Sequence, residues 1–448
     1  MSVDMKKYVD QIAAKFPEQS EFIQSVDDVL SSLGPVLEKH PEWVKEKIIE
    51  RLLEPEHMVS FRVVWEDDNG DPQVNIGYRC QFNGALGPYK GGLRFAPNVY
   101  PGLIKGLAFE QIFKNALTGL PIGGGKGGSD FNPNGKSDKE VMRFCQAFMA
   151  EANKHIGADI DVPAGDQGVG GREIGYLFGQ YRKITGRYEA GVLTGKGVET
   201  GGLAGRSEAT GYGIVFFIQN MLKACNDTIE GKTAVISGFG NVAWGTAQKL
   251  EQVGAKLIAF SGPDGYILDE SGITGEKVDY FLELRASGKD ICSPYAEKYP
   301  EAKFFPGEKP WGVKADLYIP CATQNDVHLE HAKQIVASGC KYYCEGANLP
   351  TTPDALEYLL EHGVVVGPAK AANAGGVACS AIEMSQNAGH TVFSKEDVFE
   401  RLETIMKSIH DSSAEAAKEY GFGYNLVAGA NIAGFLRVAK AMHAQGWI

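Results

Sequence analysis

Residues Thr233-Ala-Val-Ile-Ser-Gly-Phe-Gly-Asn-Val-Ala243 decide the fold of the second half of this chain. A short apolar strand, Thr233–Ser237, runs into a turn of the form G-x-G-x-x-A, and a helical stretch from Trp244 to Val253 follows. Glycines in such a turn allow a tight bend and let the backbone approach a pyrophosphate, which the helix N-terminus stabilises. The turn therefore predicts a dinucleotide site at Gly238, Phe239, Gly240 and Val242, and a glycine-rich turn without a cofactor is the alternative.

The residues that follow continue the alternation of strand and helix. Lys256–Phe260 is a second apolar strand, and Asp264 just past it stands where an acidic residue binds a dinucleotide ribose, about 20 residues after the turn. Further strands are expected at 316–321, 342–346 and 364–368. Ligands bind beyond the carboxyl ends of such strands, so the candidate cofactor neighbours are Ala322, Thr323, Asn325 and Asn348. The predicted fold class is α/β, with a doubly wound sheet of the Rossmann type.

The most chemically loaded stretch of the first half is Pro121-Ile-Gly-Gly-Gly-Lys-Gly-Gly-Ser-Asp130. Lys126 is surrounded by glycines, which predicts a packed loop whose backbone approaches a ligand. A lysine short of water has a lowered pKa and can act as a base. A phosphate-binding P-loop does not fit, because Leu120 and Gly127 replace residues that this motif requires. An ordinary surface turn with an exposed lysine is the remaining alternative.

The segments on either side of this loop predict helices and a β-hairpin. Helical spacing over residues 4–54, interrupted at Gly34-Pro35 and Pro41, predicts two or three amphipathic helices. Alternating runs before and after a turn cluster predict the hairpin. The expected elements are a hairpin of 59–65 with 74–82, and helices at 103–118, at 137–155, after 370 and at 428–448.

Polar residues in these segments are candidates for a ligand site. Lys90 stands beside paired glycines, and Gln111 and Lys114 lie on the expected helix 103–118. Asp166 follows a strand that begins at Asp159, and it is expected to be exposed in the turn after that strand. An exposed carboxylate is ordinary, so Asp166 is a weak candidate on its own.

Composition limits the partners. The 448 residues carry a net charge of −12, which argues against nucleic acid or an anionic membrane but leaves room for small anions. No run approaches the roughly 20 apolar residues of a membrane span, and the N-terminus lacks the apolar core of a signal peptide. The eight cysteines are scattered without a CxxC pair, as reduced thiols are. We therefore expect a cytoplasmic protein without a metal.

Taken together, the motifs resemble the hexameric glutamate dehydrogenases, with the NAD-using clostridial type most similar. The motifs are Pro88-Tyr-Lys-Gly-Gly92, the glycine–lysine stretch 121–130, Pro163-Ala-Gly-Asp166, Gly238-Phe-Gly-Asn-Val-Ala243, Pro320-Cys-Ala-Thr-Gln-Asn325 and Ala372-Asn-Ala-Gly-Gly376. The resemblance implies a homo-oligomer, expected to be a hexamer, and a substrate domain and a Rossmann domain that close over a cleft. The expected substrate-binding and oligomerisation domain comprises residues 1–200 and 424–448, and the dinucleotide-binding domain residues 201–423.

The resemblance also implies roles for matching residues. Lys126 would be the catalytic lysine, and Asp166 would move protons to and from the amino group. The α-carboxylate would be held by Lys114, Gln111 and backbone around Gly165, and the side-chain carboxylate by Lys90 and Ser380. Thr210 and Asn241 would face the cofactor. The implied reaction is reversible deamination of L-glutamate to 2-oxoglutarate and ammonium, with hydride transfer to a nicotinamide cofactor.

The charges of the candidate residues agree with this implied reaction and argue against two other functions. Lys90 and Lys114 are two cations for the two carboxylates of glutamate, and they would also lower the pKa of Lys126. A branched-chain or aromatic amino-acid dehydrogenase of the same superfamily is the nearest rival, but it would leave Lys90 unpaired. A catalytically silent nucleotide-sensing or scaffold protein would have no reason to keep Lys90, Lys114, Lys126 and Asp166 together.

The expected cofactor is NAD rather than NADP. The residues after the second strand, Ser261-Gly-Pro-Asp264, include no Arg or Lys to bind a 2′-phosphate, and an acidic residue suits a free ribose hydroxyl. Arg285 and Lys289 downstream could reach a phosphate, so an NADP-dependent glutamate dehydrogenase working in ammonia assimilation is the alternative.

Overall fold

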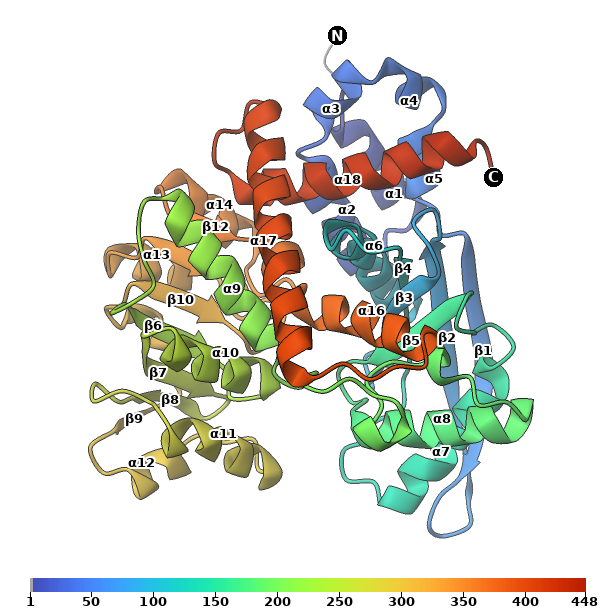
Figure 1. Ribbon diagram of the computed structural model, residues 1–448, viewed down its shortest axis with the longest axis horizontal. Helices are drawn as coiled ribbons and strands as arrows, with labels where there is room; N and C mark the ends of the chain where they lie inside the picture. Colours follow the sequence, from blue (N-terminus) through green and yellow to red (C-terminus); the bar gives the residue numbers. More distant parts are fainter. Residues whose placement is uncertain (1–2) are drawn as a thin grey trace. The chain divides into compact units, whose positions relative to one another are not determined.

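The computed structural model describes residues 3–448, which form two compact units (Figure 1). The first unit contains the chain up to Ala204 together with Val377–Val398 and Asn431–Ile448. The second contains Gly205–Gly376 and Phe399–Ala430. Each unit therefore combines segments that are far apart in the sequence.

Five short helices begin the first unit, where helical spacing predicted only two or three. They are α1 (Lys6–Lys15), α2 (Ser20–Leu30), α3 (Gly34–Lys39), α4 (Pro41–Lys45) and α5 (Ile48–Leu52). Pro35 and Pro41 lie in the first turns of α3 and α4 rather than in breaks between helices. Proline suits the first helical positions, because the amide hydrogen it lacks would have no partner there.

A five-stranded sheet forms the centre of the first unit. Its strands are β1 (His57–Glu66), β2 (Pro72–Asn83), β3 (Tyr89–Phe95), β4 (Gly123–Ser129) and β5 (Asp161–Gly165), in the order β1-β2-β4-β3-β5. The predicted hairpin is confirmed, since β1 pairs antiparallel with β2. Strand β4 runs antiparallel to β2 and parallel to β3, and β3 runs parallel to β5.

Helices cover both faces of this sheet. On one face α6 (Pro101–Leu117) packs directly on β4. On the other, α7 (Asp138–Ala152) and α8 (Gly171–Thr185) enclose an aromatic core with β1 and β3. The unit also contains the short helices η1 (Ala190–Val192) and η2 (Val198–Thr200), most of α16 (Gly375–Ala388), and the C-terminal part of α18 (Leu426–Gln445). Arg437 of α18 donates hydrogen bonds to the carbonyls of Ala116, Gly119 and Leu120.

The glycine-rich stretch is a strand, so its prediction as a loop was wrong. All seven residues of β4 are buried between β2 and β3. A Cβ at Gly124 would lie 2.6 Å from Cγ1 and 2.7 Å from Cα of Ile112 on α6. Glycine has no side chain to separate the two backbones, and this allows the helix to pack directly on the strand. The prediction that the stretch is packed is confirmed, and the alternative of a surface turn is excluded.

The second unit is built on a seven-stranded sheet. Its strands are β6 (Thr233–Ser237), β7 (Lys256–Gly262), β8 (Gly265–Leu268), β9 (Lys303–Pro306), β10 (Leu317–Pro320), β11 (Tyr342–Cys344) and β12 (Val365–Gly367). The order is β12-β11-β10-β6-β7-β8-β9, with the five strands from β12 to β7 parallel. The predicted doubly wound sheet is confirmed. The antiparallel edge of β8 and β9 was not predicted.

Helices connect and cover these strands. They are α9 (Ala209–Ala224), α10 (Asn241–Gln252), α11 (Glu276–Ala286), α12 (Pro294–Lys298), η3 (Pro310–Gly312), α13 (Leu329–Ala337), α14 (Pro353–Glu361), α15 (Ala369–Ala372) and α17 (Lys395–Glu419). Strand order reverses at β6, the chain's first strand in this sheet, because β7 lies on one side of it and β10 on the other. In open α/β sheets, ligands bind at the carboxyl ends of the strands on either side of such a reversal.

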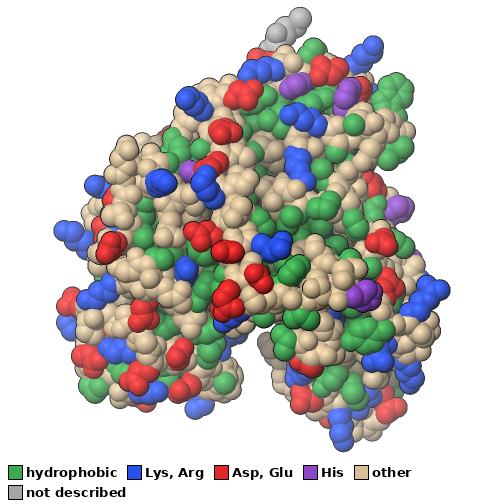
Figure 2. Space-filling view, viewed as in Figure 1, with side chains coloured by type: hydrophobic (Ala, Val, Ile, Leu, Met, Phe, Trp, Pro, Cys, Tyr) green, Lys and Arg blue, Asp and Glu red, His purple; other side chains and the backbone are tan. Residues whose placement is uncertain are grey.

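The surface carries charges of both signs. On the face drawn in Figure 2, Lys and Arg side chains are interspersed with Asp and Glu. Within residues 3–448, no helix has the length and apolar character to cross a membrane. All eight cysteines are free, and seven of them are buried.

Candidate active site

Lys126 lies in the middle of β4, on the face of the sheet that packs on α6. It pairs with Cys80 of β2 and is 4% exposed. Side chains alternate along a strand, so Lys126 shares its face with Gly124, the contact point of α6. Its Nζ lies 3.2 Å from Oδ2 of Asp166. The lysine is therefore fixed by a buried strand rather than by a mobile loop.

Asp166 follows the last residue of β5. It was predicted to be exposed, but it is not. Its side chain is only 17% exposed, because Arg94 and Lys126 enclose it. Arg94 donates from Nε to Oδ2 at 3.0 Å. Burial by itself would raise the pKa of this carboxyl, but Lys126 and Arg94 together hold it well below its usual value. Asp166 is thus ionised at neutral pH.

The cluster has two cations for one carboxylate, and this determines which group can lose a proton. Burial is the main cause of a lowered pKa at Lys126, and the positive charges of Arg94 and Arg79 lower it further, against the opposing effect of Asp166. Arginine does not deprotonate in proteins, so loss of the Lys126 proton is the step that neutralises the cluster. The prediction of a lowered lysine pKa is confirmed.

Two arginines were missed by sequence reasoning. Arg94 and Arg79 are cations that the structure places among the causes of the lowered pKa at Lys126. Arg94 is four residues from Lys90, so strand alternation places both on one face of β3 and could have identified it. Arg79 lies on β2, and its position next to β4 depends on a pairing that the sequence does not reveal.

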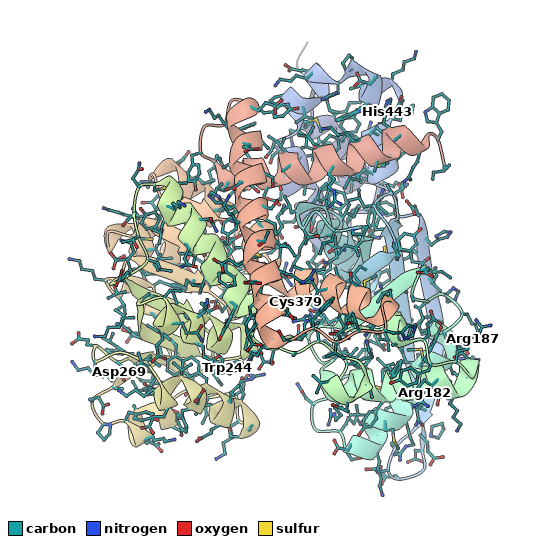
Figure 3. The ribbon with its side chains drawn as sticks, viewed as in Figure 1. Arg182, Arg187, Trp244, Asp269, Cys379 and His443 are labelled. Atoms are coloured by element: carbon teal, nitrogen blue, oxygen red, sulfur yellow. The ribbon has the colours of Figure 1, made fainter. Side chains whose placement is uncertain are left out.

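The residues predicted to bind substrate all belong to the same unit as this cluster. Lys90 of β3 and Ser380 of α16 are 1% and 2% exposed, and Gln111 and Lys114 lie on α6. Gly165 is the last residue of β5, next to Asp166. Cys379, labelled in Figure 3, precedes Ser380 on α16. The individual roles of these residues remain predictions.

Asn115 of α6 organises this group and was also missed. Its Nδ2 donates to the carbonyl of Lys90 at 3.0 Å and to that of Gly123, and its Oδ1 accepts a hydrogen bond from Gln111. A Cβ at Gly91 would lie 3.4 Å from Cγ of Gln111. The helix is thereby fixed against β3 and β4, the strands that carry Lys90 and Lys126.

The second unit presents a cradle for a dinucleotide at the end of β6. Gly238 has φ +84°, a conformation that disfavours other residues, and it lies against Ala322 after β10. Ser237 Oγ accepts hydrogen bonds from the amides of Cys321 and Ala322, which joins the two loops. Helix α10 begins at Asn241, three residues earlier than predicted, so Asn241 and Val242 form its first turn.

Gly240, the residue before α10, is surrounded by open space. A Cβ built there would meet no heavy atom within 4 Å. Packing therefore does not require glycine at this position, whereas close approach of a pyrophosphate to the amides of the helix N-terminus does. The residues present thus fit a bound dinucleotide.

The remaining cofactor candidates lie around this cradle in the same unit. Asp264 accepts hydrogen bonds from the amides of Cys292 and Ser293 at 2.8 and 3.0 Å, so its carboxylate also has a structural role. Phe239 is 3% exposed and packs against Phe260. Three more candidates follow or begin elements of the unit: Thr210 in the first turn of α9, Thr323 after β10 and Asn348 after β11. Their contacts with a cofactor remain predictions.

Asn373 is a further residue that sequence reasoning missed. Its Nδ2 donates to Oδ1 of Asn348 at 3.0 Å and to the carbonyls of Gly346 and Ala347. It is 3% exposed, and its Oδ1 is buried without a partner. It therefore fixes the loop after β11.

Across residues 3–448, no group of three or more His, Cys, Asp and Glu side chains is arranged to hold a metal ion.

The first unit thus contains a buried lysine–carboxylate–arginine cluster, and the second contains a cradle that fits a dinucleotide. The chain belongs to the glutamate/leucine/phenylalanine/valine dehydrogenase family. The model of that family matches residues 201–446, and the model of its dimerisation domain matches residues 55–183.

Within the family, the chain is similar over its whole length to glutamate dehydrogenases. The NAD-specific glutamate dehydrogenase of Clostridium symbiosum is 59% identical, with 99% of each chain covered. That of Bacteroides fragilis (strain YCH46) is 53% identical, with both chains fully covered. A relative from Psychrobacter sp. (strain TAD1), 51% identical over 99% of each chain, is named NADP-specific. A solved structure of a glutamate dehydrogenase is 58% identical, covers 99% of each chain and has a TM-score of 0.98.

Proposed function

We propose that this chain is a glutamate dehydrogenase that interconverts L-glutamate and 2-oxoglutarate with release or uptake of ammonium. The observation that carries the proposal is the buried cluster of Lys126, Asp166 and Arg94, with Lys90 buried on the neighbouring strand. Full-length similarity to NAD-specific glutamate dehydrogenases supports it independently. A branched-chain or aromatic amino-acid dehydrogenase, the rival from the same superfamily, is not favoured by these relatives.

The proposed chemistry assigns different tasks to Lys126 and Asp166. A bound nicotinamide cofactor would supply the acceptor for the hydride that leaves Cα of the substrate. Lys126, with its lowered pKa, takes a proton from the water that attacks the resulting imino carbon. Asp166 is ionised at rest between two cations, so it can accept a proton from Lys126 and pass it to the nitrogen as ammonia leaves, and in the reverse direction it returns that proton. Because Lys126 and Asp166 are in contact, a proton can move between them without passing through solvent.

Substrate choice is proposed to depend on Lys90. Lys90 is buried, and its ammonium group is proposed to bind the side-chain carboxylate of glutamate, with Ser380 as a second donor. Lys114, Gln111 and the backbone at Gly165 are proposed to bind the α-carboxylate. Norvaline has the same length as glutamate but no side-chain carboxylate, so it cannot form this ion pair with Lys90. Discrimination between them by a factor of about 10⁴ is within reach of such a site.

NAD is the proposed cofactor, and NADP is a possible second one. No Lys or Arg occurs between Ser261 and Asp264, and the carboxylate of Asp264 repels a 2′-phosphate. The guanidinium of Arg285 lies 5.7 Å from the ring of Phe239 and also pairs with the exposed Asp290. The NAD-specific relatives support this preference.

The proposal extends to assembly and location. The proposed oligomeric state is a homohexamer, as the resemblance implies. The proposed compartment is the cytoplasm, which suits eight free cysteines. The proposed division is a substrate domain of residues 1–200 and 424–448, which contains Lys126 and Asp166, and a dinucleotide domain of residues 201–423, which contains the G-x-G-x-x-A turn.

Spectrophotometry of NADH formation tests this function. With L-glutamate and NAD, the purified protein should form NADH, and 2-oxoglutarate with ammonium should consume it. NADP in place of NAD should give a clearly lower kcat/KM. A protein that binds NAD but converts no glutamate would favour the silent nucleotide-sensing alternative, and a clear advantage for NADP would reverse the cofactor assignment.

A further inference from the structure

Arg79 and Asp161 form a buried ion pair in the first unit that the proposed chemistry does not use. Arg79 lies on β2 and Asp161 is the first residue of β5, and their side chains are 3% and 0% exposed. Nε of Arg79 donates to Oδ2 of Asp161 at 2.8 Å, and Nη2 donates to Oδ1. Nη1 donates to the carbonyl of Gly91 on β3 at 3.0 Å. Every nitrogen of this guanidinium therefore donates a hydrogen bond to β3 or β5.

The pair lies on the face of the sheet opposite Lys126. Cys80 pairs with Lys126 and Arg79 with Gly127, and consecutive residues of a strand point to opposite faces. The sheet order is β2-β4-β3-β5, so the Arg79 side chain must cross both β4 and β3 to reach Asp161. Its path lies beneath the strand that carries Lys126.

The glycines of β4 leave room for this crossing. A Cβ at Gly127 would lie 3.0 Å from Cδ of Arg79, and one at Gly125 would lie 3.5 Å from its Nη2. Alternation places both glycines on the face of Arg79 and leaves Lys126 between them on the other face. The glycines that flank the lysine thus accommodate the arginine.

We propose that Arg79, held by Asp161, is a positioning residue for the reaction: it ties β2, β3 and β5 together behind β4 and fixes a positive charge behind Lys126. The inference rests on the proposed function. Strand β3 carries Lys90 and Arg94, β4 carries Lys126, and Asp166 follows β5, so the clamp spans the strands of the proposed site. Gln81 of β2 reinforces it by donating from Nε2 to Asp161 at 3.0 Å.

The fixed charge affects the protonation of Lys126. Arg79 is one of the positive charges that lower the pKa of Lys126. The other charged side chains on elements packed against β4 include Lys90 and Arg94 on β3, Lys105, Glu110 and Lys114 on α6, Asp161 on β5 as the partner of Arg79, and Asp166 after β5. Removing the charge of Arg79 raises the pKa of Lys126. The acid limb of the kcat/KM profile, which requires the neutral lysine, then moves to higher pH.

Two substitutions separate the charge of Arg79 from its geometry. Arg79→Met should lower kcat/KM for glutamate by about 10²-fold and move the acid limb upward by about half a pH unit or more. Arg79→Lys keeps the charge, but one ammonium group cannot reach both carboxylate oxygens of Asp161 and the carbonyl of Gly91 at the same time. We therefore expect kcat to fall while the acid limb stays in place. An acid limb that does not move in a folded Arg79→Met protein would overturn the proposal.

A double variant and a remote ion pair control for loss of stability. Arg79→Met with Asp161→Asn leaves no uncompensated charge; if it restores Tm and activity together, the pair is only structural and the proposal fails. The proposal expects Tm to recover without activity. Lys277→Met breaks the pair of Lys277 with the buried Asp269 of the second unit (Figure 3), and it should lower Tm without moving the acid limb. If Arg79→Met does not fold, the pH profile and the kcat of Arg79→Lys provide the test. A kcat of Arg79→Lys equal to that of the unaltered protein would overturn the proposal.

A labelling measurement makes failure of this proposal distinguishable from failure of the proposed function. The rate at which acetic anhydride acetylates Lys126, followed by mass spectrometry over a range of pH, reports the neutral amine without any turnover. Arg79→Met should shift the midpoint of this rate upward relative to the unaltered protein. An unshifted midpoint overturns the proposal, whereas a shift in a protein that oxidises no glutamate overturns only the function.

Discussion

Two glycine-rich segments of this protein look alike in sequence and need glycine for different physical reasons. In β4 a Cβ at Gly124 would collide with the backbone of α6 at Ile112, so glycine is required by the fold. In the turn after β6 a Cβ at Gly240 would meet no atom within 4 Å, so the space next to it is available to a ligand. The difference teaches that a glycine cluster near a site need not contact the ligand. In β4 the glycines position Lys126, and in the turn they admit the dinucleotide.

The largest expected effect comes from the lysine that β4 presents. Lys126→Ala should lower kcat by at least about 10³-fold, because the base that activates water is lost. NAD affinity, measured by fluorescence titration, should be unchanged, since the cradle lies in the other unit. Lys183→Ala, which removes an exposed lysine of α8, is the matched control and should be neutral. Retained turnover in Lys126→Ala would refute its role.

The next largest effect is expected at Lys90 on β3. Lys90→Leu should lower kcat/KM for L-glutamate by about 10³-fold or more, because a buried charge partner of the side-chain carboxylate is removed. The kcat/KM for L-norvaline should change little or rise. Steady-state kinetics with both amino acids measure this. An equal loss on both substrates would show that Lys90 does not recognise the side-chain carboxylate.

On the β4 side of the comparison, Gly124→Ala should destabilise the protein. Its Cβ would lie 2.6 Å from Cγ1 and 2.7 Å from Cα of Ile112, and a helix backbone cannot yield as a flexible side chain can. We expect a loss of about 3 kcal/mol in the free energy of unfolding, visible as a lower Tm by calorimetry. A Tm equal to that of the unaltered protein would mean that α6 adapts, and the close approach would not explain the glycine.

On the turn side, Gly240→Ala should have the smallest effect on stability and a selective effect on the cofactor. Its φ of −77° and ψ of −173° are accessible to alanine, and no atom opposes the Cβ. The free energy of unfolding should change by less than about 1 kcal/mol, while the KM for NAD rises about tenfold as the methyl group enters the pyrophosphate space. A lower Tm with an unchanged KM for NAD would mean that Gly240, like Gly124, is required by packing rather than by the cofactor.

The comparison also explains what the sequence could and could not predict. Apolar strands and the G-x-G-x-x-A turn are local signals, and β6, α10 and β7 formed where they indicated, with α10 starting at Asn241 because the turn's last residues already have helical geometry. Strand β4 carried no such signal, since glycine has low intrinsic strand propensity and only pairing with β2 and β3 makes the segment a strand.

The same limit applied to the site. Lys126 and Asp166 could be singled out from their glycine-rich surroundings and from the family resemblance. The enclosure of Asp166 depends on Arg94, and the charge behind Lys126 depends on Arg79, which reaches across two strands to Asp161. Strand order and register decide such contacts, and neither is encoded in a motif of ten residues.

The most direct test of the account is the ratio of kcat/KM for L-glutamate to that for L-norvaline, measured by NADH formation with the unaltered protein. A site in which a buried lysine pairs with the side-chain carboxylate predicts a ratio on the order of 10⁴. A ratio near one, or a preference for norvaline, would contradict the claim that this cluster of buried cations selects a dicarboxylic amino acid.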